Sequence, residues 1–172
     1  IIIPNYNGEA LLKKNLSKVI EAAQAYKNKK TEIIVVDDAS SDESIATIQQ
    51  FNNSTINNQN IIKIIQNDRN LGFASTVNKG VSKARGEIIV LLNTDVAPER
   101  NFLEPLLKHF SDPNVFAVGC LDKSIEDGNI VLRGRGIGRW QNGFFMHSRG
   151  EVNKRDTLWV SGGSGAFRKL LW

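Results

Sequence analysis

Cysteine is almost missing from this sequence of 172 residues. Cys120 is the one cysteine, so an internal disulfide framework and a metal cluster built from cysteines are both excluded. Because Cys120 ends an apolar run, we interpret it as a small core residue and not as a reactive thiol.

Long apolar stretches are missing as well. No stretch approaches the length of about 20 residues that a transmembrane helix needs, and no signal peptide is visible. We therefore expect a cytoplasmic protein, with a place at the inner face of a membrane left open. The chain begins inside the apolar run Ile1–Ile3 without an initiating methionine and stops at Trp172, so we expect a chain cut at both ends.

A strong excess of either charge is also lacking. The chain has 22 Lys and Arg against 18 Asp and Glu, a formal net charge of +4. This mild excess suits anionic ligands such as nucleotides or a membrane surface, but it is too weak to predict a nucleic-acid partner. A hydrophobic content of 41% and a charged content of 23% are typical of a globular domain, and the length allows one domain over residues 1–172.

Short aliphatic runs alternate with helical patterns over the first 120 residues. Residues 87–92 are almost entirely aliphatic, which indicates a strand buried on both faces. Alternating strands and helices predict an α/β fold with a doubly wound, mostly parallel sheet. The five expected strands lie at 1–3, 32–36, 61–65, 87–92 and 115–120, and the four expected helices at 12–23, 41–51, 74–84 and 102–110.

Several boundaries follow from local signals. Ser40 and Glu43 have the spacing of a capping box, which predicts a helix from about residue 41. Gly86 is expected to cap the end of the third helix. Residues 52–60 are rich in Asn, and we expect them to form a surface loop.

The composition and pattern of the sequence change after residue 120, where Gly becomes frequent and helical periodicity disappears. Asp127-Gly128-Asn129 is typical of a hairpin turn between short strands. Residues 144–146 and 157–161 are expected to be further strands. This part of the chain predicts a smaller mixed or antiparallel layer beside the parallel sheet.

Polar side chains follow the expected strands at the point where each strand ends. Asp37 and Asp38 follow the second strand, and Asp95 follows the fourth. The carboxyl ends of parallel strands share one edge of the sheet, which is where open α/β sheets bind ligands. Carboxylates gathered there repel one another unless a cation or a donor-rich ligand offsets their charge. We therefore favour a nucleotide with a divalent metal over the simpler interpretation of Asn93-Thr94-Asp95 as a turn.

Four segments together resemble the glycosyltransferase family 2 domain. They are Ile1–Asn7, Glu32–Asp42, Asn70–Ala74 with Asn78-Lys79-Gly80, and Leu92–Asp95. The resemblance implies the GT-A fold of inverting, nucleotide-sugar-dependent transferases, with residues 1–120 as the nucleotide-binding half and 121–172 as the start of an acceptor-side half. The Asp127-Gly128 hairpin and Ser161–Arg168 resemble the branch that includes bacterial rhamnosyltransferases.

The resemblance also implies roles for single residues. Asn93-Thr94-Asp95 stands at the Asp-x-Asp motif of the family, so Asp95 would ligate Mg²⁺ or Mn²⁺ on the donor diphosphate, while Asn93 stands where the motif has its first Asp. Pro4 and Tyr6 would flank the nucleobase, and Asp37 or Asp38 would accept a hydrogen bond from the base or ribose. The remaining implied contacts are Asn70 and Gly72 with the nucleotide, and Gly162, Gly163 and Arg168 with donor or acceptor.

The implied reaction moves a hexosyl or deoxyhexosyl group from a UDP-, dTDP- or GDP-linked sugar to a hydroxyl of a glycan or a lipid-linked saccharide, in the synthesis of a cell-surface polysaccharide or glycan. The catalytic base of the family is a carboxylate after the Gly-rich segment, so we expect it beyond Trp172. Two alternatives stay open: a nucleotide-sugar-binding module without turnover, and a sugar nucleotidyltransferase. The latter would need a Gly-rich phosphate loop at the first strand, and Asn5–Gly8 is too short and too poor in Gly.

Overall fold

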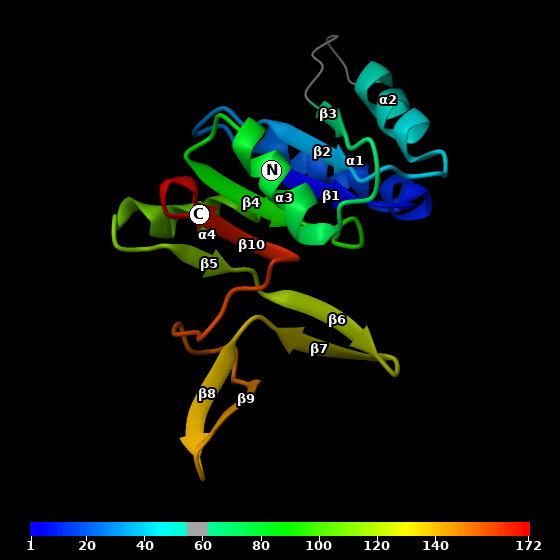
Figure 1. Ribbon diagram of the computed structural model, residues 1–172. Helices are drawn as coiled ribbons and strands as arrows, with labels where there is room; N and C mark the ends of the chain where they lie inside the picture. Colours follow the sequence, from blue (N-terminus) through cyan, green and yellow to red (C-terminus); the bar gives the residue numbers. More distant parts are fainter. Residues whose placement is uncertain (55–61) are drawn as a thin grey trace.

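Six strands form one sheet, in the order β3-β2-β1-β4-β10-β5 (Figure 1). The structure, a computed structural model, describes residues 1–54 and 62–172. The parallel strands are β1 (Ile2–Asn5), β2 (Ile33–Asp37), β3 (Ile62–Gln66) and β4 (Ile88–Leu92). Strand β10 (Ser164–Arg168) lies between β4 and β5 (Ala117–Gly119) and runs antiparallel to both. The expected α/β fold with a mostly parallel sheet is confirmed.

The central strands are buried on both faces, as their aliphatic sequences predict. Alternate residues of a strand point to opposite faces of the sheet, so Ile3 and Val35 join one core while Ile2 and Ile34 join the other. Figure 1 shows α3 (Phe73–Lys83) on one face of the sheet, where it contributes Val77 to the second core. The first core is covered by α1 (Glu9–Ala25), α2 (Ser44–Ser54), α4 (Leu103–Leu107) and the 3₁₀ turn η1 (Lys108–Ser111).

A last 3₁₀ turn, η2 (Lys169–Leu171), follows β10 near the end of the chain. Among the described residues, none of the helices combines the length and the apolar character that crossing a bilayer demands.

Two of the predicted helix boundaries are wrong. Helix α2 begins at Ser44 and not near 41, because the Asp42 carboxylate accepts from the Ser44 amide at 3.1 Å and takes the capping role. The α3 helix ends at Lys83, and Ala84 caps it in an extended conformation, so Gly86 is not its cap. Of the expected loop 52–60, residues 52–54 belong to α2, and the rest lies outside the described residues.

The chain after residue 120 forms two hairpins and one strand of the main sheet. The turn at Asp127 and Gly128, both with positive φ, joins β6 (Asp122–Glu126) to β7 (Asn129–Arg133), so the predicted hairpin is confirmed. A second hairpin pairs β8 (Gly136–Gln141) with β9 (Phe144–Arg149).

The strand predicted at 157–161 is wrong, because the strand of this region is β10 at 164–168. β10 needs glycine at position 165, since a Cβ there would lie 2.5 Å from a methyl of Val160. Strand β10 lies inside the main sheet, so residues 121–172 contribute both to that sheet and to the two hairpins.

Candidate functional site

The carboxyl ends of the parallel strands and the start of β10 meet at one edge of the sheet. The amide of Asn93, just after β4, donates to the Gly163 carbonyl at 2.9 Å. Position 163 requires glycine, because a Cβ there would lie 2.9 Å from Nδ2 of Asn93. On the far side of β10, the Cys120 amide donates to the Ser164 carbonyl at 3.3 Å. Segments 93–95, 120–122 and 161–164 therefore converge at this edge.

The Asn93-Thr94-Asp95 segment is a tight turn that helix α1 holds through a hydrogen bond from Asn15. The Val96 amide donates to the Asn93 carbonyl at 3.1 Å, and Nδ2 of the buried Asn15 donates to the Thr94 carbonyl at 2.9 Å. Asp95 is exposed, so its carboxylate faces outward from this support. Sequence reasoning missed Asn15, although an amide on the apolar stripe of Leu12 and Leu16 was a signal that could have revealed it.

A pocket of about 760 Å³ opens beside Asp95, between the β4 turn, the β5–β6 segment and the start of β10. Asp122 lies in its wall and accepts a hydrogen bond from the Ser164 hydroxyl at 2.6 Å. Burial raises the pKa of Asp122 and outweighs the hydrogen bond from Ser164 and the charge of Arg133, which lower it, while the charge of Asp95 adds a smaller increase. The two carboxylates are therefore close enough to repel each other.

These residues fit a hard divalent cation. Asp95 and Asp122 offer carboxylate oxygens, and Oδ1 of Asn93 is buried without a hydrogen-bond partner. Oxygen ligands of this kind are those that Mg²⁺ and Mn²⁺ prefer. Within residues 1–54 and 62–172, no three acidic, His or Cys side chains come together to hold a metal by themselves. A cation here would therefore need further oxygens from a ligand, as a diphosphate supplies.

Asp37 is engaged by the protein itself. Its carboxylate accepts from Nδ2 of Asn5 at 2.8 Å, from the Ser40 hydroxyl at 2.6 Å and from the Ser40 amide at 3.0 Å. Only 1% of the residue is exposed. Asp37 therefore positions the β1 and β2 ends, and its oxygens are already occupied by these donors.

Asp38 anchors the turn that follows β3. Its Oδ1 accepts from Nδ2 of Asn67 at 2.6 Å and from the Leu71 amide at 2.8 Å, and its Oδ2 accepts from the Gly72 amide at 2.8 Å. Burial by itself would raise the pKa of Asp38, but these donors and the Thr76 hydroxyl together hold it below its ordinary value. Asp38 stays ionised, and its charge is offset by protein donors.

Asn70 and Gly72 lie in the turn that Asp38 holds. The Gly72 amide also donates to Oδ1 of Asn70 at 3.0 Å, and Gly72 has φ of +81°, a conformation that glycine adopts without strain. Sequence reasoning missed Asn67, whose Oδ1 accepts from Nζ of Lys79 at 2.6 Å. Its place directly after β3, at the same edge as the other polar residues, was the available signal.

Two exposed aromatic side chains border this edge. Tyr6 follows β1 and is 55% exposed, and Phe73 begins α3 and is 53% exposed. Pro4 lies within β1, paired with Val36, and is half-buried. A Cβ at Gly162 would lie 3.8 Å from the ring of Phe73. The segment 161–164 therefore runs between the start of α3 and the pocket beside Asp95.

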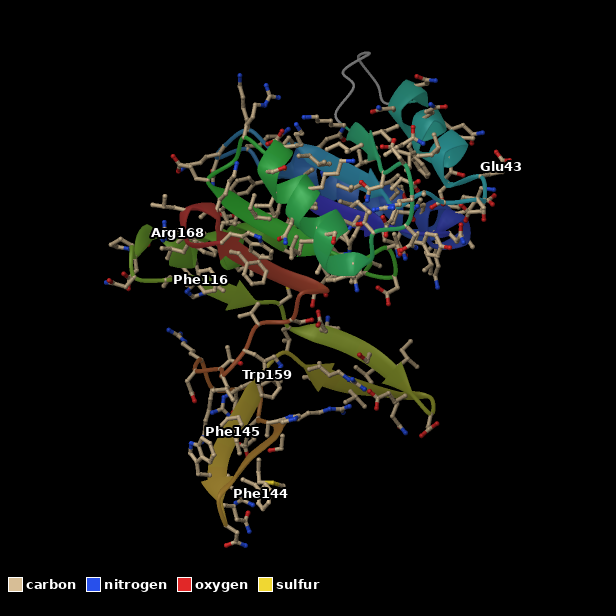
Figure 2. All side chains as sticks on the ribbon, viewed as in Figure 1. Glu43, Phe116, Phe144, Phe145, Trp159 and Arg168 are labelled. Atoms are coloured by element: carbon tan, nitrogen blue, oxygen red, sulfur yellow. The ribbon has the colours of Figure 1, made fainter. Side chains whose placement is uncertain are left out.

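Arg168 is the predicted site residue that the structure places elsewhere. It pairs with Ile88, at the opposite end of β4 from Asp95. Its guanidinium donates to the carbonyls of Phe110, Asp112 and Val115 and lies over the Phe110 ring (Figure 2). Arg168 therefore does not lie with the other predicted site residues, because β10 runs antiparallel to β4 and its last residue is at the opposite end of the sheet from Asp95.

Comparison with known proteins gives a consistent result. The model of the family described as glycosyl transferase family 2 matches residues 1–172. N-acetylgalactosaminyltransferase 7 of Drosophila melanogaster is 28% identical over 165 residues, which are 91% of this chain and 27% of that protein.

Solved structures agree in fold. A mannosyltransferase from Pyrobaculum calidifontis, in complex with GDP-Man and Mn²⁺, is 29% identical with a TM-score of 0.64, over 74% of this chain and 36% of its own. Staphylococcus aureus TarS 1–349, in complex with UDP-GlcNAc, is 21% identical with a TM-score of 0.68, over 99% of this chain and 45% of its own. The chain thus spans less than half the length of these three relatives.

Proposed function

Because the chain belongs to glycosyltransferase family 2, we propose that it forms the donor-binding part of an inverting transferase that uses a nucleotide-diphosphate sugar. The observation that carries this proposal is the exposed Asp95 carboxylate, which lines one pocket together with Asn93, whose Oδ1 has no hydrogen-bond partner, and the half-buried Asp122. A cation with a diphosphate relieves the repulsion and satisfies the amide oxygen at the same time.

The nucleoside would lie along the edge between β1 and α3. Tyr6 offers a stacking face for the base, with Pro4 beside it. The Asp38-held turn, through Asn70 and the side-chain-free Gly72, lets the ligand approach the backbone. We propose that Asp37 or Asp38 accepts a hydrogen bond from the base or ribose. Each of these carboxylates already accepts three hydrogen bonds from the protein, so the ligand would share or replace one of those donors.

The diphosphate would then reach Asn93 and Asp95, and the sugar would enter the pocket of about 760 Å³ beside them. Asp122, Ser164 and the backbone around Gly162 and Gly163 would contact its hydroxyl groups. The mannosyltransferase from Pyrobaculum calidifontis was solved with GDP-Man and Mn²⁺, which supports a nucleotide sugar and a divalent ion as the ligand pair here.

The chemistry follows from this placement. When bound, Mg²⁺ or Mn²⁺ neutralises the charge that develops on the departing nucleoside diphosphate. Asp95 and Asn93 hold that end of the donor, so an acceptor hydroxyl of a glycan or lipid-linked saccharide approaches the opposite face of the anomeric carbon and the configuration inverts. A carboxylate must take the proton from that hydroxyl. We propose that this base lies beyond Trp172. We also propose that the reaction belongs to the synthesis of a polysaccharide or glycan.

Titration of UDP, GDP and dTDP with and without Mn²⁺, followed by calorimetry, tests the proposal. We expect one nucleotide to bind more tightly with Mn²⁺, and Asp95→Ala to remove the metal-dependent part of the affinity. Glu43→Ala, an exposed carboxylate at the start of the α2 region, is the matched control and should bind like the wild type (Figure 2).

Two results would contradict the site: no nucleoside diphosphate binds, or Asp95→Ala and Glu43→Ala behave alike. A protein that binds the donor but never transfers sugar to any acceptor would instead favour a binding module without turnover.

A further inference from the structure

The β8–β9 hairpin carries large apolar side chains that the sheet does not cover. Figure 1 shows this hairpin projecting away from the main sheet, and Figure 2 shows Phe144 and Phe145 on it. The exposed fractions are 75% for Trp140, 71% for Phe144, 45% for Phe145 and 51% for Met146. Adjacent exposed side chains of this size are typical of an interaction surface.

The hairpin holds these side chains in a defined arrangement. Trp140 pairs with Phe145 across the strands, and their rings meet edge to face with centroids 5.4 Å apart. Asn142 and Gly143, both with positive φ, form the tight turn at the end. A Cβ at Gly138 would lie 2.4 Å from the Phe145 ring, so glycine there lets the ring pack down on the strand.

Positive charge gathers around the same hairpin. Residues 133–156 contain six Lys and Arg and two Asp and Glu, a net charge of +4 that equals the net charge of the whole chain. Arg139 stands beside Trp140, opposite Met146, and among the residues that the structure describes it has no acidic partner within ion-pair distance. All other residues together are neutral.

We propose that the β8–β9 hairpin docks on an anionic lipid surface, with Trp140 and Phe144 entering the interface and Arg139 facing the headgroups. The charge of Arg149 is partly offset, because its guanidinium lies 3.9 Å from the Glu126 carboxylate. Trp is enriched at membrane–water interfaces, and basic residues bind anionic leaflets electrostatically. A second copy of the chain is a poorer occupant, because symmetric pairing would bring two surfaces of like charge together. The proposal does not depend on the donor site.

The neighbouring β6–β7 hairpin provides a matched control. Ile125 and Ile130 are 80% and 71% exposed, but this hairpin has no aromatic residue and carries the acids Glu126 and Asp127. Apolar exposure is thus as great there, while the charge that would attract an anionic surface is missing.

Flotation with phosphatidylcholine vesicles, with and without phosphatidylglycerol, tests the proposal on the full-length protein. We expect binding only when phosphatidylglycerol is present, and release at high salt. The double variant Trp140→Ser/Phe144→Ser should lose this binding, and Arg139→Gln should weaken it. Ile125→Ser/Ile130→Ser should bind as the wild type does, and so should Asp95→Ala.

Circular dichroism and thermal unfolding of the hairpin variants check that they are folded. The proposal is overturned if the wild type does not float with anionic vesicles, or if the two double variants float equally. It is also overturned if the β8–β9 hairpin mediates self-association in the absence of lipid. Light scattering would then show a larger particle for the wild type than for the Trp140→Ser/Phe144→Ser variant.

Discussion

Single polar residues at the sheet edge keep their charge because backbone amides and side-chain amides face them. Asp38 is 3% exposed and still ionised, since Asn67, Leu71 and Gly72 all donate to it. Asp122 shows the opposite case, because burial raises its pKa by more than the hydrogen bond from Ser164 and the charge of Arg133 lower it, and the charge of Asp95 adds to the increase. The Asp38 carboxylate therefore stabilises the folded chain, whereas we expect a bound ligand to offset the charge of Asp122.

Asp38 predicts a pH dependence of stability. Its pKa is lower in the folded chain than in the unfolded chain, so the stabilisation is complete above the unfolded pKa and is lost as the pH falls through the folded pKa. Asp38→Asn should lower the free energy of unfolding at neutral pH by roughly 1–3 kcal/mol, because its NH₂ group faces donors. Urea unfolding from neutral pH down to about pH 2 should show the gap between variant and wild type closing in acid. A constant gap would contradict this account.

Asp122 predicts two effects of opposite sign. In Asp122→Asn the amide oxygen can still accept from Ser164, while the cost of burying the charge and the smaller repulsion from Asp95 both disappear. The variant should therefore melt at a higher temperature than the wild type without ligand, and bind nucleotide with Mn²⁺ more weakly. Thermal unfolding and calorimetry of the same sample check both signs. Asp127→Asn, in the hairpin turn, is the control, and equal behaviour of the two variants would rule out a role at the site.

At the scale of the elements, helix α3 lies against β1 and β2 through a glycine. A Cβ at Gly80 would lie 2.7 Å from a methyl of Ile2 and 3.0 Å from a methyl of Val36. Glycine costs helix propensity, so its presence here is explained by the short distance between helix and sheet. That distance sets where the start of α3, with Gly72 and Phe73, meets the site.

Gly80→Val should destabilise the protein by about 1–3 kcal/mol, because the added methyl groups push α3 from the sheet. Chemical denaturation measures this loss. Ser75→Ala, on the exposed side of the same helix, should change stability by less than about 0.5 kcal/mol. If Gly80→Val were as stable as Ser75→Ala, the close packing of α3 would be disproved.

At the scale of the whole molecule, much of the architecture could be predicted from the sequence. The aliphatic runs predicted β1, β2 and β4, and with them the edge of the sheet where Asp95 lies. A strand buried on both faces can be recognised locally, because it is a short continuous run of apolar residues. The place of β10 could not be predicted, since it depends on pairing with two strands distant in sequence and on a contact that requires glycine at 165, beside Val160. Asn15 and Asn67 were missed for the same reason, because their partners are remote.

The two hairpins stand apart from both cores, which predicts that they contribute little to folding stability. Replacing the tip residues 139–146 by a short Gly-Ser turn should change the free energy of unfolding by less than about 1 kcal/mol, because no residue of the tip belongs to either core. Urea unfolding and nucleotide titration of this variant check the expectation. A large loss of stability would show that the tip packs against the sheet.

The antiparallel position of β10 also determines when the sheet can be completed. Leu92 pairs with Ser164, and β5 has its sheet partner only in β10, so these pairings close long loops and are slow to form. Until β10 arrives, the edge of β4 that does not face β1 is open, and a strand made of Ile, Val and Leu with an open edge tends to aggregate. A ribosome-bound chain must therefore extend past Arg168 before this edge of β4 is protected.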